Sequence, residues 1–364
     1  MTRRGGPDDA RESHRVGAQT TGADVNAAKV VALVGTGGTI TGWSPSSLDL
    51  TGYAETESQR LSLAEVVAAV PEVADIAEIR QISLPAAPSH ALDLPDMLGI
   101  AGHVRTALAD DEVTGVVITH GTNTLEELAF LLELVLAPGK PVVLTAAMRP
   151  LSALSGDGPL NLVDAVRVAA SPQAASRGPV VAMNGAIWSP RRVTKANTAG
   201  SDAFRSAELG PLGFVDPDGT VIFHHREEHT PPVLDVMGAS VPRVDLVVSY
   251  PGADGVLVDA AVAAGAAGLV SAGTGAGFPT PAEHAALVRA VAAGVVVCQS
   301  YRSAAGRVRL SPRLRRAGIV AGQGLNPGKC RILLALALAT GAEAGRIQEL
   351  LDRVDGRERG DGPR

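Results

Sequence analysis

Short apolar segments rich in valine alternate with helix-like segments along most of this 364-residue chain. Each apolar segment is bounded by glycine, proline or threonine, which is typical of a buried strand. The predicted strands are residues 29–34, 113–118, 141–145, 179–183, 244–249, 268–271 and 295–299. The predicted helices are residues 63–70, 124–136, 161–170, 282–292 and 333–339. Because apolar strands that alternate with helices form mainly parallel sheets covered on both faces, the pattern predicts an α/β fold.

The alternation is interrupted at residues 226–242, a polar stretch with two adjacent prolines that is typical of a linker. We therefore predict a larger N-terminal, mainly parallel-sheet domain at residues 28–225 and a smaller C-terminal α/β domain at residues 243–352. Residues 1–27 and 353–364 are polar and mixed in charge, and are predicted to be tails, the first of them disordered. The first tail has no apolar region of the secretory kind, so we expect a cytoplasmic protein.

The composition argues against several classes of protein. Aromatic residues make up 3% of the chain and the formal net charge is −6, which leaves little material for stacking bases or neutralising phosphates, so no nucleic-acid partner is expected. No apolar run is long enough to span a bilayer, and no membrane partner is expected. The cysteines, Cys298 and Cys330, form neither a disulfide framework nor a zinc cluster, and are predicted to be small buried apolar residues.

The first candidate site follows the first predicted strand, at residues 35–40 (GTGGTI). The spacing begins like a dinucleotide-binding fingerprint, but Ile40 stands where that fingerprint requires glycine or alanine. A plain glycine-rich turn, in contrast, would not need Thr39. From these residues alone, a structural turn, an anion- or substrate-binding loop and a nucleotide-binding loop all stay open.

The second candidate site follows the strand at 113–118 and reads THGTNT at residues 119–124. A threonine hydroxyl at a strand end, beside a helix N-terminus, lies where developing negative charge is stabilised. Such a weak nucleophile needs a base. Adjacent strand residues point to opposite faces, so His120 is predicted to be a packing or hydrogen-bonding residue rather than that base.

A lysine with a lowered pKa is the other kind of base, and the chain has only four lysines, Lys29, Lys140, Lys195 and Lys329. Lys29 begins a strand and Lys140 lies in a proline-glycine turn, so both are expected at the surface. Lys195 follows a strand in a hydroxyl-rich segment, which leaves a site lysine and a solvated loop lysine as alternatives.

Residues 36–40 (TGGTI) and 119–127 (THGTNTLEE) resemble the two signatures of the bacterial-type L-asparaginase/glutaminase family. Supporting segments of the same family pattern follow in order along the chain. They are 147–150 (AMRP), 155–161 (SGDGPLN), 193–195 (VTK), 210–213 (GPLG), 270–273 (VSAG) and 324–327 (GLNP). The resemblance therefore covers about residues 28–350.

This resemblance implies a two-domain hydrolase acting on linear amides, which converts asparagine to aspartate and ammonia through an acyl-enzyme and uses no metal or cofactor. Thr39 would be the nucleophile, activated by Tyr53, and Thr122 and Lys195 would form the second part of the machinery. Further residues would bind the small amide substrate. They are Gly38, Ser89, His90, Gly121 and Asn123. The resemblance also implies a homodimer or homotetramer with active sites at the subunit interface.

Asn123 departs from the family pattern, which has aspartate at this position. The carboxylate would pair with the lysine and bind the α-ammonium group of the substrate, and a hydrogen bond to a charged group is worth about 1.5–3 kcal/mol. The alternatives are therefore glutamine or an amide acid without that ammonium group as substrate, or a non-catalytic amino-acid-binding protein. Glu55 or Glu57, near Tyr53, could also replace the missing carboxylate.

A second departure lies at residues 304–310 of the smaller domain. The family can supply another ammonium-binding acid there from the neighbouring subunit, whereas this segment carries Arg307 and Arg309 and no acid. It points in the same direction, toward weaker recognition of the ammonium group.

Overall fold

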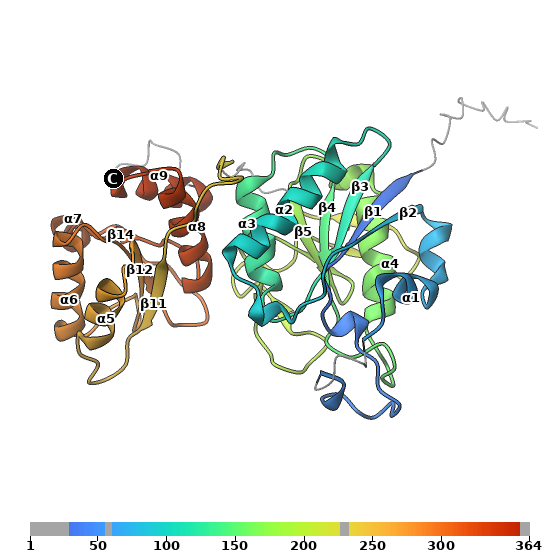
Figure 1. Ribbon diagram of the computed structural model, residues 1–364, viewed down its shortest axis with the longest axis horizontal. Helices are drawn as coiled ribbons and strands as arrows, with labels where there is room; N and C mark the ends of the chain where they lie inside the picture. Colours follow the sequence, from blue (N-terminus) through green and yellow to red (C-terminus); the bar gives the residue numbers. More distant parts are fainter. Residues whose placement is uncertain (1–28, 55–59, 226–232, 357–364) are drawn as a thin grey trace, which may run out of the picture.

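The computed structural model describes residues 29–54, 60–225 and 233–356, and it contains two sheets of unequal size, each flanked by helices (Figure 1). The larger sheet runs in the order β10-β9-β6-β5-β4-β3-β1-β2, and the smaller in the order β11-β12-β13-β14. This confirms the predicted α/β class, with a large N-terminal, mainly parallel sheet and a smaller C-terminal one. None of the helices in the described ranges is long and apolar enough to cross a membrane.

The bounds of the strands are as follows. The larger sheet contains β1 (Val30–Gly35), β2 (Glu78–Ser83), β3 (Gly115–Thr119), β4 (Val142–Thr145), β5 (Pro179–Met183), β6 (Ala186–Trp188), β9 (Gly213–Val215) and β10 (Val221–Phe223). The smaller sheet contains β11 (Val244–Val248), β12 (Gly268–Gly273), β13 (Val296–Tyr301) and β14 (Val320–Ala321). A separate antiparallel hairpin is formed by β7 (Thr194–Lys195) and β8 (Phe204–Arg205).

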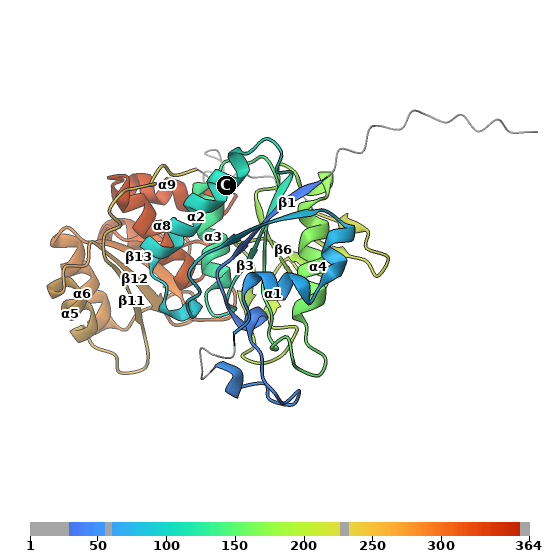
Figure 2. The same cartoon turned by 45° about the vertical axis from the view of Figure 1, so that its right-hand side comes forward.

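The helices are α1 (Leu63–Ala68), α2 (Leu94–Ala109), α3 (Leu125–Val135), α4 (Gly158–Ala169), α5 (Val256–Ala263), α6 (Pro281–Ala292), α7 (Pro312–Ala317), α8 (Pro327–Ala339) and α9 (Ala344–Val354). Helices α2 and α3 cover one face of the larger sheet, and α1 and α4 cover the other (Figures 1 and 2). Strand β1 is apolar throughout for this reason: Ala32 and Val34 pack on the first side, whereas Val31 and Leu33 pack on the second.

Helix α8 joins the two sheets into one structure, because it packs on the smaller sheet and against α3 (Figure 1). The core on the α2–α3 side of the larger sheet is continuous with the core around α8 and α9. A separate core lies under α5, α6 and α7, on the far face of the smaller sheet. The larger sheet is therefore tied to the smaller one by buried apolar surface as well as by the connecting chain.

The order of the larger sheet places a topological switch point between β1 and β3. Strands β1 and β2 lie on one side of it, and the later parallel strands β3, β4 and β5 follow on the other. Gly35 at the end of β1 pairs with Thr119 at the end of β3, so the two glycine- and threonine-rich segments emerge side by side. Ligands in open α/β sheets bind at such a point, beyond the carboxyl ends of the strands.

The structure differs from the sequence-based expectation at the C-terminal end. The predicted last helix at 333–339 is the second half of α8, which begins after Asn326, and the further helix α9 runs to Val354. The predicted tail at 1–27 and residues 357–364 lie outside the described residues, as do residues 226–232 of the predicted linker.

Candidate active site

The two candidate segments touch through their glycines. Gly38 has φ +94°, a backbone conformation that L side chains rarely adopt. A Cβ atom at Gly38 would also lie 2.6 Å from Cα of Gly121, so glycine is required at this position for steric reasons. The residues that follow these two glycines, Thr39 and Thr122, therefore lie on loops in direct backbone contact.

Thr39 and Tyr53 form the first hydroxyl pair, with Oγ1 and Oη 2.9 Å apart. Thr39 opens a short 3₁₀ turn that ends before Gly42. Gly42 leaves room for the tyrosine ring, because a Cβ atom there would lie 2.5 Å from Cδ2 of Tyr53. The bend after β1 thus presents the Thr39 hydroxyl to the phenol of Tyr53, which lies in a second short 3₁₀ turn at Gly52–Ala54.

Thr122 and Lys195 form the second pair. Lys195 lies on β7, and its Nζ donates to Thr122 Oγ1 over 2.8 Å and to Asn123 Oδ1 over 3.4 Å. Burial lowers the pKa of Lys195, because it disfavours the charged ammonium form. No carboxylate lies at position 123 to oppose this effect, so the neutral amine is easier to reach than in a solvated lysine.

Three of the predicted substrate-binding residues surround the second pair. Asn123 Nδ2 and His90 Nδ1 lie 3.4 Å apart, and the backbone oxygen of Ser89 accepts a hydrogen bond from Thr124. Ser89 is buried next to Gly121, and its Oγ has no hydrogen-bond partner among the described residues. Such an orphaned buried hydroxyl is suited to a ligand group. Glu55 and Glu57 lie outside the described residues.

His120 connects the same loops from the interior. Its Nδ1 lies 2.6 Å from Thr36 Oγ1 and its Nε2 lies 3.1 Å from Thr124 Oγ1, and the side chain is fully buried. Burial lowers the pKa of His120 to about 4, so the imidazole is neutral at pH 7. The ring acts as a hydrogen-bonding strut between the two signature segments.

A pH-dependent stability follows from this buried histidine. In the unfolded chain the histidine binds a proton below its ordinary pKa of 6.5, whereas in the folded chain it does so only near pH 4. Stability is therefore unaffected above pH 6.5 and is lost as the pH falls from there toward 4. At pH 5 this loss amounts to about 2 kcal/mol. Denaturant unfolding at pH 7.5 and at pH 5 gives the free energy of unfolding at each pH. The decrease between the two pH values should be larger in the wild type than in His120→Asn by about this amount. Equal decreases in the two proteins would contradict the prediction.

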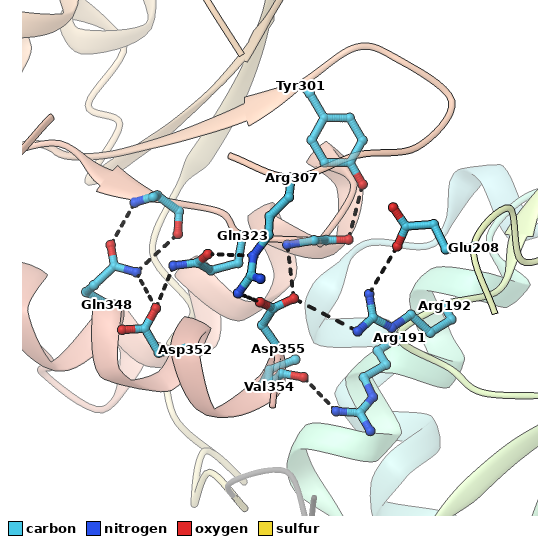
Figure 3. Close-up of polar contacts among 12 residues, drawn as sticks. Arg191, Arg192, Glu208, Tyr301, Arg307, Gln323, Gln348, Asp352, Val354 and Asp355 are labelled. Atoms are coloured by element: carbon cyan, nitrogen blue, oxygen red, sulfur yellow. Dashed lines mark hydrogen bonds and ion pairs between the residues drawn. The ribbon is translucent and has the colours of Figure 1, made fainter. Parts of the chain in front are cut away.

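Arg307, from the segment with no acid, contacts residues of its own subunit (Figure 3). Its guanidinium pairs with Asp355 and donates through Nε to Gln323 Oε1 over 3.1 Å. Asp355 also lies 3.9 Å from Arg192, which precedes strand β7 of the candidate site. In the described chain Arg307 thus belongs to a polar cluster between the two sheets.

Two charged residues beside the site, Glu126 and Lys329, were not predicted from the sequence. In the sequence, Glu126 is noted only as part of the signature segment at residues 119–127, and Lys329 has no assigned role. In the structure, Glu126 Oε1 accepts hydrogen bonds from Thr194 Oγ1 (3.0 Å) and the Lys195 N–H (3.2 Å), and its Oε2 lies 3.6 Å from Lys329 Nζ. A partial signal is present in the sequence, because Lys329 is one of only four lysines and lies just before the apolar helix predicted at 333–339.

Comparisons with known proteins agree with this geometry. The family described as asparaginase, N-terminal, matches residues 30–229, and the glutaminase/asparaginase C-terminal domain matches residues 243–351. L-asparaginase 2 of Bacillus subtilis (strain 168) is 38% identical over 323 residues, covering 87% of this chain and 84% of that protein. The glutaminase-asparaginase of Acinetobacter glutaminasificans is 36% identical, covering 88% of this chain and 98% of that protein.

A solved structure is similar as well. The crystal structure of a probable cytoplasmic L-asparaginase from Campylobacter jejuni superimposes with a TM-score of 0.84 at 35% identity, covering 89% of this chain and 99% of that one. Both family models and these relatives cover most of the chain at identities that establish common descent. The chain therefore belongs to the asparaginase family of amidohydrolases.

Proposed function

We propose that this protein hydrolyses L-asparagine to L-aspartate and ammonia through an acyl-enzyme on Thr39. One observation carries the proposal: Thr39, paired with Tyr53, and Thr122, paired with Lys195, lie on two loops that touch at Gly38 and Gly121. An amide needs a nucleophile and a proton acceptor close to one carbonyl, and this arrangement supplies both. The names of the relatives, L-asparaginase and glutaminase-asparaginase, support the same substrate class.

In the first half of the reaction, Thr39 Oγ1 attacks the amide carbonyl carbon and the C–N bond breaks. The proton of Thr39 moves to the departing nitrogen, which leaves as ammonia, and Tyr53 holds the hydroxyl in place through its 2.9 Å hydrogen bond. The glycine-rich strand ends at Gly38 and Gly121 bring backbone N–H groups to the carbonyl oxygen, where negative charge develops.

In the second half, water attacks the acyl carbon and the bond to Thr39 Oγ1 breaks. Neutral Lys195 accepts one proton of the water through Thr122 and then returns it to the oxygen of Thr39, while the other proton stays with the acid product, which ionises to aspartate. The lowered pKa of Lys195 makes the neutral, proton-accepting amine easier to reach than in a solvated lysine. The buried Oγ of Ser89, which has no hydrogen-bond partner in the described part of the chain, binds the carboxylate of the substrate, and His90 and Asn123 line the same side.

Ammonia release by the purified full-length protein tests this function. We expect turnover with L-asparagine that exceeds turnover with succinamate, the same amide acid without the α-ammonium group. L-Glutamine and D-asparagine complete the panel. Turnover of succinamate faster than that of L-asparagine would contradict asparagine as the substrate, and binding of asparagine without ammonia release would contradict an enzyme.

Asn123→Asp should strengthen recognition of the ammonium group. A carboxylate turns a neutral hydrogen bond into a charge-assisted one, so kcat/KM for asparagine relative to succinamate should rise about tenfold. The new charge, 3.4 Å from Lys195 Nζ in the present geometry, should also raise the pKa of that lysine and move the activity profile to higher pH. Full pH profiles of both proteins with both substrates measure the two effects. An unchanged substrate ratio would show that position 123 does not contact the ammonium group.

An exposed apolar surface bears on the assembly of the protein. Several apolar side chains on β11, on α5 and in the loop between them are exposed in the single chain. They are Leu246, Val248, Tyr250, Val256 and Leu257. A second copy would cover them, so we propose a homodimer or homotetramer with active sites at the subunit interface. Light scattering of the purified protein measures the mass, and a monomer would overturn this part.

A cytoplasmic location is proposed on two grounds. The relative from Campylobacter jejuni is described as a probable cytoplasmic L-asparaginase, and the two cysteines of this chain are free and buried. Cell fractionation tests the location.

We also keep the domain division at residues 226–242 as a proposal. Limited proteolysis tests the division.

A further inference from the structure

The short strand that carries Lys195 is held by a carboxylate from another helix. Glu126, in the first turn of α3, accepts hydrogen bonds at Oε1 from the Thr194 hydroxyl and from the Lys195 N–H. Strand β7 is two residues long and, among the described residues, pairs only with the equally short β8, so its own ladder fixes it weakly. The position of the lysine therefore depends on Glu126.

The other oxygen of Glu126 faces the start of helix α8 in the smaller domain. Its Oε2 accepts from Asn326 Nδ2 over 3.0 Å and lies 3.6 Å from Lys329 Nζ. Lys329 is 1% exposed, and its ammonium group donates in turn to the backbone oxygen of Val193. A buried ammonium group is stable only when paired, so these partners fix one another's positions. Three successive residues, 193–195, are thereby held by one buried ion pair.

The two residues before 193–195 contact the end of helix α9 in the smaller domain (Figure 3). Arg191 Nη1 donates to the backbone oxygen of Val354 at the end of α9, over 2.6 Å, and Arg192 lies 3.9 Å from Asp355. Residues 191–195 thus form a continuous segment with contacts to α3, α8 and the end of α9. Glu126 and Lys329 form hydrogen bonds to residues 193–195 and to the start of α8. The pair therefore acts on the segment that carries Lys195.

We propose that Glu126 and Lys329 are positioning residues for Lys195, and that through them helix α8 of the C-terminal domain sets the distance between Lys195 Nζ and Thr122 Oγ1. This rests on the proposed function, in which Lys195 accepts a proton through Thr122. A small shift of β7 lengthens the 2.8 Å hydrogen bond between these two side chains and slows proton transfer. Substrate binding at Ser89, which lies on another segment, is left unchanged.

Thr194→Val and Thr194→Ser give the sharpest test in the full-length enzyme. Valine keeps the β-branched shape but removes the hydrogen bond to Glu126, whereas serine keeps the hydroxyl. We expect Thr194→Val to lower kcat for asparagine about tenfold, and Thr194→Ser to stay within about twofold of the wild type. The affinity for the product aspartate, measured by calorimetry, should be the same in all three proteins.

Lys329→Met and Lys140→Met form the second matched comparison. Each of these lysines donates to a backbone oxygen, Lys329 to Val193 and Lys140 to Asp110, but Lys140 is only partly buried and lies away from the site. We expect Lys329→Met to lose at least about tenfold in kcat and Lys140→Met to lose nothing. If Lys329→Met does not fold, the threonine pair decides the matter.

A Thr194→Val enzyme with unchanged kcat would overturn the proposal, as would an equal loss in Thr194→Ser or a loss confined to KM. Lys195→Met separates this failure from failure of the proposed function. If that variant is inactive and Thr194→Val is normal, the positioning role alone is wrong. If Lys195→Met remains fully active, the proposed function is itself wrong.

Discussion

Thr39→Ala should lower the rate of ammonia release from asparagine by about four orders of magnitude, to the level of binding and electrostatic effects alone. The methyl group of alanine leaves the 3₁₀ turn and the contact of Gly38 with Gly121 in place, so the fold should not change. The variant should still bind aspartate. Initial rates with a coupled ammonia assay measure the loss directly.

Thr39→Ser is the matched control for this experiment. Serine keeps a hydroxyl within reach of Tyr53, whose Oη lies 2.9 Å from Thr39 Oγ1 in the wild type. This variant should therefore retain activity within about tenfold of the wild type. A Thr39→Ala enzyme that retains a tenth or more of the wild-type rate would show that the nucleophile lies elsewhere, with Thr122 the next candidate.

Lys195→Met should lower kcat about a thousandfold, because it removes the group that accepts the proton passed by Thr122. Methionine fills a similar volume, and the contacts of the Lys195 backbone with Glu126 do not involve the removed amine. Lys195→Arg should be nearly as inactive, since a guanidinium group does not lose its proton. A merely electrostatic role would instead be preserved by arginine.

The pH dependence of the wild-type activity also tests the role of Lys195 as a proton acceptor. Burial favours the neutral form of Lys195, so its pKa lies below that of a free lysine and activity should rise as the pH increases through it. The Lys195→Met variant should lack this rising limb. Equal slopes in the two profiles would assign the limb to another group.

The sequence predicts the parallel strands well because their surroundings are simple. Residues of β1, β3 and β5 are buried on both faces, so each reads as an unbroken apolar run. Strand β2 (EIRQIS) lies at the edge of the sheet and is partly exposed. Because of its polar residues, it does not appear as an apolar run and is not predicted from the sequence. The antiparallel strands β6, β9 and β10 have three residues each, too few for a period to be seen.

The sequence does not predict helix α2 and predicts only part of helix α8, for different reasons. Helix α2 was not predicted, although Asp93 and Asp96 form a capping box at its start, because Gly99, Gly102 and His103 interrupt its apolar pattern. Helix α8 was predicted only in its second half, since Lys329 and Arg331 make its beginning look polar.

For the candidate site, the sequence alone points to two glycine- and threonine-rich strand ends, whereas the roles proposed for Thr39 and Thr122 come from the family resemblance. Thr39 and Thr122 follow glycine-rich strand ends, and a parallel sheet brings such ends together. The pairing of Glu126 with Lys329 could not be foreseen, because it joins positions far apart in the chain through the packing of α3 on α8. A lone lysine in a sequence shows its charge but not its burial, and here burial decides its role.

Peptide mapping of the acyl-enzyme identifies the nucleophile without relying on rates. The wild-type protein would be mixed with asparagine, quenched in acid during turnover and digested, and the peptides analysed by mass spectrometry. We predict a peptide heavier by one aspartyl group, with fragmentation placing that group on Thr39, and no such peptide from Thr39→Ala. An aspartyl group on Thr122 or on any other residue would contradict the assignment of Thr39 as the nucleophile.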